Sequence, residues 1–168
     1  MGVRAVKKNV EEQLKALFAG HPVPPIEVII PILEKAGRGE QELTAQFYDT
    51  ELSLAKGIKE IWGLRDRNMK VLAKVLEVIN SWEGQRFEPI ALTESRLSIS
   101  ISDCSMLHVG KNVSSNVKSK FCDLICNGGS KALMDVVLGQ DKATCSWDKA
   151  LIKGARNCRL VFESVKTK

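Results

Sequence analysis

The segment at residues 121–163 reads "FCDLICNGGSKALMDVVLGQDKATCSWDKALIKGARNCRLVFE". It contains four of the chain's five cysteines, and the fifth, Cys104, lies shortly before it in "ISISDCSMLH". Along the segment, apolar residues at helical spacing give way to the alternation that is typical of strands. The C-terminal part of the chain is therefore expected to combine helix and sheet, and to carry whatever chemistry the thiols provide.

The residues around this segment predict a four-stranded antiparallel sheet. Two alternating runs between residues 86 and 103 predict a hairpin that turns at Glu94 and Ser95, and Pro89 favours an edge position for its first strand. A helix is predicted from about 112 to 126, ending at the glycines of "NGG", and another from 130 to 138. Two final strands, around Cys145 and Cys158, complete a second hairpin.

The front half of the chain is predicted to be helical. Apolar residues at helical spacing indicate helices over 4–18, 25–36, 40–63 and 66–82. The proline-rich passage "HPVPPIEVIIPILEKAG" between the first two helices indicates a boundary. We therefore predict an N-terminal helical extension over 1–39 and an α+β domain over 40–168, in which a small antiparallel sheet of two hairpins has helices packed on one face.

Composition and charge exclude several classes of function. The chain has 168 residues, of which 44% are hydrophobic and 27% charged, as in a globular protein. No apolar run approaches the roughly 18 residues that cross a membrane. The net charge of +5 is spread along the chain and aromatic residues make up only 5%, a pattern that does not favour nucleic-acid binding. The N-terminus lacks a secretory signal, so we expect a cytoplasmic protein with reduced thiols.

The helix predicted over 66–82 has two apolar stripes. One stripe contains Val71, Val75, Val78 and Trp82. A helix that is apolar on two faces needs cover on both. We therefore predict a homodimer in which this stripe is buried, with cover by the N-terminal helix of the same chain as the competing possibility.

The five cysteines and one histidine allow three interpretations. Cys122 and Cys126 are four residues apart on a predicted helix and so share a face, and Cys145 and Cys158 fall in paired strands that could bring them close. With Cys104 and His108 they are numerous enough for a zinc site or an iron–sulfur cluster, although neither metal's usual spacing is present. The alternatives are a catalytic thiol and inert buried cysteines.

The order of these parts resembles a known family. A helical region runs into "ELSLAKGIKEIWGLRDRNMKVLAKVLEVI", a hairpin ends in "SISDCSML", a helix carries "FCDLICNGG", and a last hairpin has "KATCSW" and "GARNCRLVFE". Over residues 42–164 this resembles the L-2-amino-thiazoline-4-carboxylic acid hydrolase-like family and, more distantly, the 4-vinyl-reductase-type small-molecule-binding domains. The resemblance implies an apolar ligand pocket beside a zinc ion. It implies as zinc ligands Cys104, Cys126, Cys145 and Cys158, with Cys122 as a substitute.

Three functions follow as hypotheses. The first is a small-molecule-binding domain for an organic ligand, with a cysteine cluster that holds a metal ion. The second is a hydrolase that opens a cyclic amidine of the thiazoline type, with Cys104 as nucleophile and His108 as base. The third is a structural or interaction protein with inert buried thiols.

Overall fold

The α+β prediction is confirmed. The computed structural model describes residues 3–22, 24–35, 37–104, 113–149 and 155–165. Among the described helices, none has both the length and the hydropathy that are needed to cross a bilayer. The helices are α1 (Val3–Gly20), α2 (Ile26–Lys35), α3 (Arg38–Ile61), α4 (Met69–Trp82), α6 (Ser115–Lys120), the π-helical η1 (Phe121–Cys126) and α7 (Asn127–Val137). The strands are β1 (Arg86–Leu92), β2 (Arg96–Ser102), β3 (Ala143–Lys149) and β4 (Cys158–Ser164).

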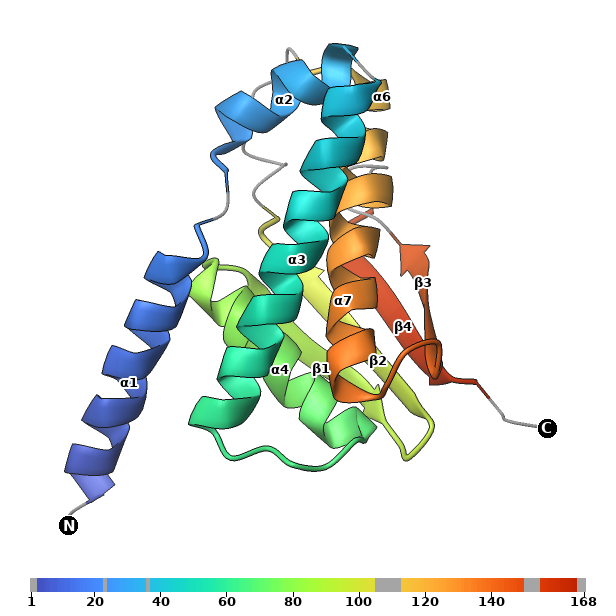
Figure 1. The fold of residues 1–168 in the computed structure, drawn as a ribbon. Coiled ribbons are helices and arrows are strands. Elements are labelled where there is room, and N and C mark those ends of the chain that lie inside the picture. The colour runs from blue at the N-terminus through green and yellow to red at the C-terminus, as the bar shows by residue number, and fades with distance from the viewer. Residues whose placement is uncertain (1–2, 23, 36, 105–112, 150–154, 166–168) are drawn as a thin grey trace.

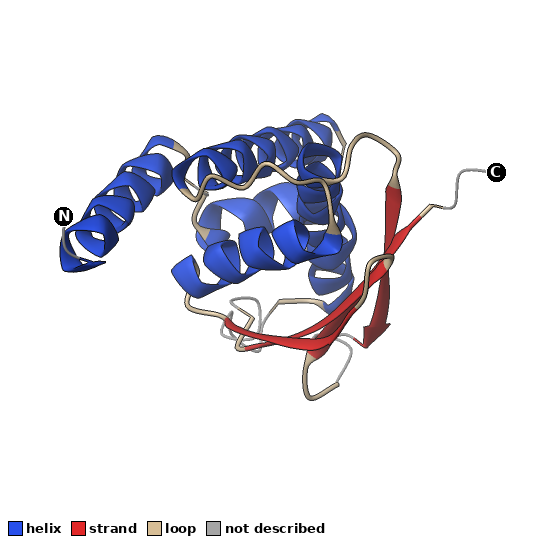
Figure 2. Cartoon of the chain, turned by 90° about the horizontal axis from the view of Figure 1, so that it is seen from below, coloured by secondary structure: helices blue, strands red, loops and turns tan. Residues whose placement is uncertain are grey.

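The four described strands form one antiparallel sheet in the order β1-β2-β4-β3. The two predicted hairpins are present, and they join because β2 pairs with β4, where Leu97 lies opposite Phe162. Pro89 lies in β1 at the edge of the sheet, as predicted. Figure 2 shows the helices together on one side of this sheet. The sheet therefore forms one wall of the molecule, and the helices form the other.

The core lies between the helices and the sheet. In Figure 1, α3 and α7 run side by side, and these two helices make the most extensive helix–helix contact. Leu54 and Leu72 from the helices and Phe162 from the sheet are almost completely buried. Phe18 and Leu33 extend the same core to α1 and α2. The extension predicted over 1–39 thus contributes to the core, and the boundary at residue 39 stays a prediction.

The prediction that "NGG" ends a helix was wrong. Residues 115–137 form one continuous helical path, in which η1 connects α6 to α7. Gly129 lies where α7 meets α3, and a Cβ there would be only 3.1 Å from Cγ of Glu51. A side chain at this point would press on Glu51, so glycine suits the close packing of α7 against α3. This packing outweighs the local preference of glycine for a helix end.

The reason for expecting a homodimer was wrong in part. Val71 and Val75 are already buried within the single chain, because α4 packs against β1, β2, α3 and α7. Trp82 is 44% exposed, and its ring stacks on Phe18 of α1 with the ring centroids 4.4 Å apart. The N-terminal helix thus supplies part of the cover, which was the competing possibility. The homodimer itself stays a prediction.

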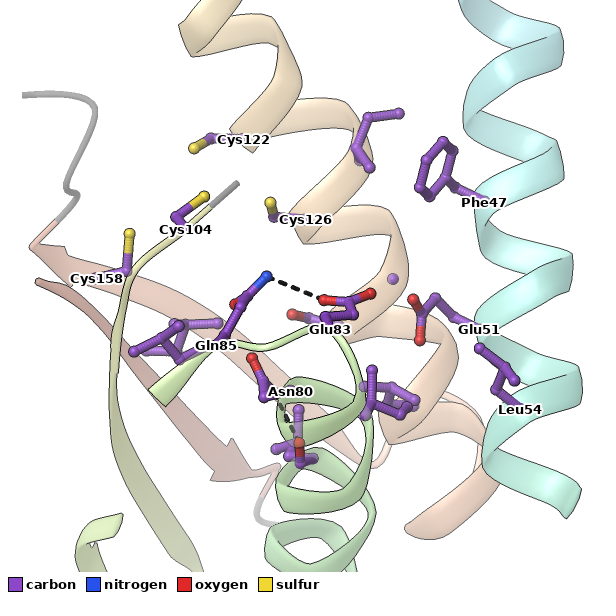
Figure 3. Close-up of a pocket in the computed structure, with 18 of the residues that line it drawn as sticks. Phe47, Glu51, Leu54, Asn80, Glu83, Gln85, Cys104, Cys122, Cys126 and Cys158 are labelled. Carbon is purple, nitrogen blue, oxygen red and sulfur yellow. Dashed lines mark hydrogen bonds between the residues drawn. The ribbon is translucent and has the colours of Figure 1, made fainter. Parts of the chain in front are cut away.

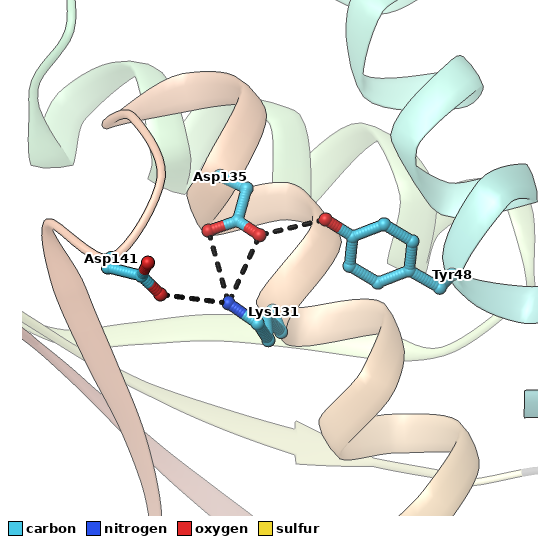
Figure 4. Close-up of polar contacts among 4 residues, drawn as sticks. All are labelled: Tyr48, Lys131, Asp135 and Asp141. Atoms are coloured by element: carbon cyan, nitrogen blue, oxygen red, sulfur yellow. Dashed lines mark hydrogen bonds and ion pairs between the residues drawn. The ribbon is translucent and has the colours of Figure 1, made fainter. Parts of the chain in front are cut away.

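A network of polar side chains connects α3 and α7 (Figure 4). Tyr48 of α3 donates a 2.8 Å hydrogen bond to Asp135 of α7. Lys131 makes ion pairs with Asp135 and with Asp141, at 3.2 and 3.3 Å. The hydrogen bond to Asp135 raises the pKa of the Tyr48 hydroxyl, because the neutral phenol is the donor. The network therefore links the two helices at a point away from the core.

We expect Tyr48→Phe to lower the free energy of unfolding by about 1 kcal/mol, because the substitution removes one hydrogen bond to a charged acceptor and little apolar contact. Urea denaturation at pH 7 measures the change. Thr144→Val, at an exposed position of β3, is the control, with an expected effect below about 0.5 kcal/mol. Equal effects from the two substitutions would contradict the role assigned to the network.

Candidate ligand-binding cavity

A cavity of about 530 Å³ lies between the helices and the sheet. Its walls come from α2, α3, α4, η1, α7 and the strands β2, β3 and β4, together with residues at the end of α1. Three of the chain's five phenylalanines and two of its three tryptophans line it: Phe18, Phe47, Phe121, Trp82 and Trp147. A largely apolar, concave space of this size with a few polar groups is typical of sites for small organic molecules.

The end of α4 brings two polar side chains to the cavity. The helix stops at Trp82, and Gly84 takes a φ of 74°, a conformation that glycine adopts without strain. The amide of Gln85 then donates to the carbonyl of Asn80 at 2.8 Å. This turn directs Glu83 and Gln85 toward the cavity, where Gln85 Nε2 donates to Glu83 Oε2 at 3.0 Å (Figure 3).

Glu51 is the most unusual residue of the cavity wall. It lies in the middle of α3, only 8% of it is exposed, and its Oε2 has no hydrogen-bond partner. Burial, and secondarily the nearby charge of Glu83, raise its pKa to about 8. A buried polar atom without a partner is costly to the fold, and such atoms often belong to a binding site. Glu51 is therefore a candidate to contact a ligand.

Glu83 is a second carboxyl group in the same space. The surrounding protein atoms raise the pKa of its carboxyl group, but the residue as a whole is exposed to water, and this solvation makes the shift smaller than that of Glu51. Among the described residues that line the cavity there is no lysine or arginine. The two carboxyl groups thus lack a cationic side chain to balance them within the described wall.

Four of the cysteines lie at this cavity, but not the four that were predicted. Figure 3 shows Cys104, Cys122, Cys126 and Cys158 on one side of the cavity, with Glu51 on the other. Cys122 and Cys126 share a helix face as predicted, and their thiols are hydrogen-bonded to each other. The predicted substitute, Cys122, is therefore in the group that the fold assembles.

Cys145 does not join Cys158, so the prediction that the paired strands bring them close was wrong. In the register of β3 and β4, Cys145 lies opposite Phe162, four residues along the strand from Cys158. Four residues of strand span roughly 13 Å. The thiol of Cys145 instead contacts the Ser130 hydroxyl of α7. The prediction that these two strands pair does not fix which residues face each other, because the register depends on the other residues of the strands.

The described thiols do not form a ready metal site. Among the residues that the structure describes, no group of three or more histidine, cysteine, aspartate or glutamate side chains has an arrangement that could hold a metal ion. Zinc binds thiolates, yet the hydrogen bond with Cys122 and burial raise the pKa of Cys126 well above its ordinary value. Burial also raises the pKa of Cys145 to about 12. The zinc ion therefore stays a prediction.

The catalytic pair stays a prediction as well. Cys104 follows β2, lines the cavity and is buried, but His108 lies outside the described residues. All five cysteines are thiols rather than disulfides, and three of them, Cys104, Cys122 and Cys158, are buried. Their burial also fits the interpretation that they are packing residues.

The sequence around Glu51 contains a signal for its unusual position. The apolar stripe of α3 includes Phe47, Leu54 and Ile58, and Glu51 occupies the stripe position between the first two. A carboxylate in the middle of an apolar stripe is either at an interface or in a cavity, because a solvated position would lie on the opposite face. Glu83, which follows the last turn of α4, gave no comparable signal.

Comparisons with known proteins show the fold. No protein family model and no curated protein matches the chain. The structure is similar to that of a trafficking protein particle complex subunit 3 from Naegleria fowleri, covalently bound to palmitic acid, with a TM-score of 0.60 and 15% identity over 95% of this chain and 97% of that one. It is also similar to the phenol-responsive sensory domain of the transcription activator PoxR, determined with phenol. That match has a TM-score of 0.58 and 10% identity over 82% of this chain and 71% of that one.

These likenesses are of fold alone, because both identities are low. They place the chain among small α+β domains and agree with the predicted architecture. Neither is a match to a thiazoline hydrolase or to a vinyl reductase, so the family resemblance found in the sequence stays a prediction.

Proposed function

We propose that this protein is a small-molecule-binding domain that holds an apolar organic ligand in the cavity between α3, α4, α7 and the sheet. The observation that carries the proposal is the cavity of about 530 Å³, with aromatic walls and a buried, unpartnered carboxyl group. Filling it with an apolar ligand removes hydrocarbon surface from water on both partners.

Two solved structures of similar fold support the proposal. One of these proteins is covalently bound to palmitic acid, and the other is a sensory domain that responds to phenol. Both ligands have apolar bodies, and aromatic side chains favour such bodies. Ligand binding in this fold is therefore reasonable for the present chain. The zinc-dependent and hydrolytic alternatives have no comparable support from the described residues.

The test is binding of a simple apolar probe, 4-phenylbutan-1-ol, measured by calorimetry and by tryptophan fluorescence. Trp82 and Trp147 line the cavity, so a probe inside it should change their emission. We expect one probe per chain and a dissociation constant in the range of about 10–100 µM, which is reasonable for a ligand of eleven heavy atoms. Absence of saturable binding up to millimolar probe would contradict the proposal.

A pair of adjacent glycines offers a matched test of where the probe binds. Gly129→Leu places a side chain at the wall beside Glu51, where a Cβ already lies 3.1 Å from Cγ of that residue. We expect it to weaken probe binding at least tenfold. Gly128→Leu is the control, because a Cβ there meets only Thr44, at 3.8 Å, and Gly128 does not line the cavity. Equal affinities in the two variants would place the probe elsewhere.

A further inference from the structure

The polar part of the cavity is acidic in a way that an apolar ligand alone does not explain. Glu51 is more than nine-tenths buried, its side chain is directed into the cavity, and Oε2 has no hydrogen-bond partner (Figure 3). Glu83 faces the same space from the end of α4 and interacts electrostatically with Glu51. Gly129 of α7 leaves room for the Glu51 side chain to lie there. The fold thus holds one buried carboxyl group beside aromatic side chains, and a second carboxyl group, on the exposed residue Glu83, faces the same space.

We propose that the ligand of this cavity is an apolar molecule with one cationic nitrogen, such as an amine or an amidine, which binds between the carboxyl groups of Glu51 and Glu83. The inference rests on the proposed function, because it assigns a chemical class to the ligand of the same cavity. The apolar body would lie against the aromatic and aliphatic walls, and the nitrogen would donate hydrogen bonds to Oε2 of Glu51.

Charge favours a cation over the other classes of ligand. An ammonium group donates up to three hydrogen bonds and would satisfy Oε2 of Glu51 while it balances the charge of the pair. An anionic ligand would place a third acidic group beside the two carboxyl groups. The free-energy cost of this repulsion rises in a poorly solvated space. A neutral alcohol could donate one hydrogen bond but would leave the two carboxyl groups uncompensated. Aromatic faces such as those of Phe47 and Trp82 also attract cations.

The remaining ionisable groups at the cavity do not replace this cation. His21, at the end of α1, donates from Nδ1 to the carbonyl of Leu17 at 3.0 Å. Gln85, the hydrogen-bond donor to Glu83, is uncharged. The other ionisable groups that line the cavity are thiols from η1, β4 and the end of β2: Cys104, Cys122, Cys126 and Cys158. The described wall therefore contributes acids, thiols and one histidine, but neither lysine nor arginine.

The experiment compares three probes that differ only in the polar group: 4-phenylbutylamine, 4-phenylbutan-1-ol and 4-phenylbutanoate. Calorimetry gives each affinity at pH 6.0 and pH 8.5. At pH 8.5 we expect the amine to bind at least tenfold more tightly than the alcohol, and the carboxylate to bind more weakly than both. The amine's affinity should rise at least tenfold between the two pH values, because the carboxyl groups ionise in this interval while an alkylamine, like lysine, stays protonated.

Two variants of α3 complete the test. Glu51→Gln keeps the shape of the side chain, and we expect it to lower the amine's affinity at pH 8.5 at least tenfold and the alcohol's less than threefold. Glu42→Gln, on the exposed face of the same helix, should change neither affinity. Alcohol binding without a preference for the amine, or a preference that survives in Glu51→Gln, would overturn the inference but not the proposed function. Failure of all three probes to bind would overturn both.

Discussion

Glu51→Gln is expected to stabilise the protein at pH 8 by about 2–4 kcal/mol, and at pH 5 by less than about 1 kcal/mol. Glu51 has a pKa of about 8 in the folded chain, raised from 4.5, because burial opposes its ionised form. Between these two values the unfolded chain has released the proton that the folded chain still binds. The free energy of unfolding therefore falls as the pH rises from about 4.5 to 8, and it levels off above that range. Glutamine has no proton to release in this range, so the free energy of unfolding of the variant does not fall for this reason.

Urea denaturation of both proteins at pH 5 and pH 8, without ligand, measures the effect. Glu42→Gln is the matched control, because Glu42 lies on α3 with 65% of its side chain exposed, in an ion pair with Arg38. Its effect should stay within about 0.5 kcal/mol at both pH values. A Glu51→Gln variant that is destabilised at pH 8 would show that the folded chain stabilises the ionised carboxylate, contrary to the proposed cavity chemistry.

A gain of stability when an ionisable group is replaced by a neutral one is informative about function. Residues that serve packing usually destabilise the fold when replaced, whereas binding sites often contain groups that cost stability. Glu51 has that character, since its carboxyl is buried without a partner for Oε2. If the proposed cationic ligand is the natural one, its binding should recover the loss at pH 8. The same amine should then raise the unfolding midpoint of the natural chain more than that of the variant.

Phe162→Ala is expected to lower the free energy of unfolding by about 3–5 kcal/mol. Phe162 lies in β4 at the centre of the sheet, fully buried, opposite Leu97 of β2 and Cys145 of β3. Truncation of a buried aromatic side chain loses its transfer free energy and leaves a cavity that the neighbouring strands cannot fill. Since a domain of this size is stable by only about 5–15 kcal/mol, the variant should unfold at a much lower urea concentration.

Ile90→Ala is the control for this substitution. Ile90 lies in the edge strand β1 and is 48% exposed, so its truncation should cost less than about 1 kcal/mol. Urea denaturation at pH 6 keeps the effect of Glu51 the same in both variants. A cost below about 1 kcal/mol for Phe162→Ala would contradict the placement of this residue in the core.

The local structure of the chain could be predicted from the sequence. The four N-terminal helices, both hairpins, the edge position of Pro89 and the shared face of Cys122 and Cys126 all follow from patterns within a few residues. Such patterns are reliable because they arise from the period of the helix or strand itself. The wrong prediction of a helix end at Gly129 has the opposite origin, because α7 packs at this point against α3, which lies far away in the sequence.

By itself, then, the sequence determined the α+β class, the four N-terminal helices, both hairpins and the presence of an acid in the apolar stripe of α3. Tertiary structure decided which residues meet. The register of β4 places Cys158 near Cys104 and keeps Cys145 away, and the turn after α4 directs Glu83 to the same space as Glu51. The physical reason is that a binding site depends on the register and packing of several elements at once, and no single segment encodes that arrangement.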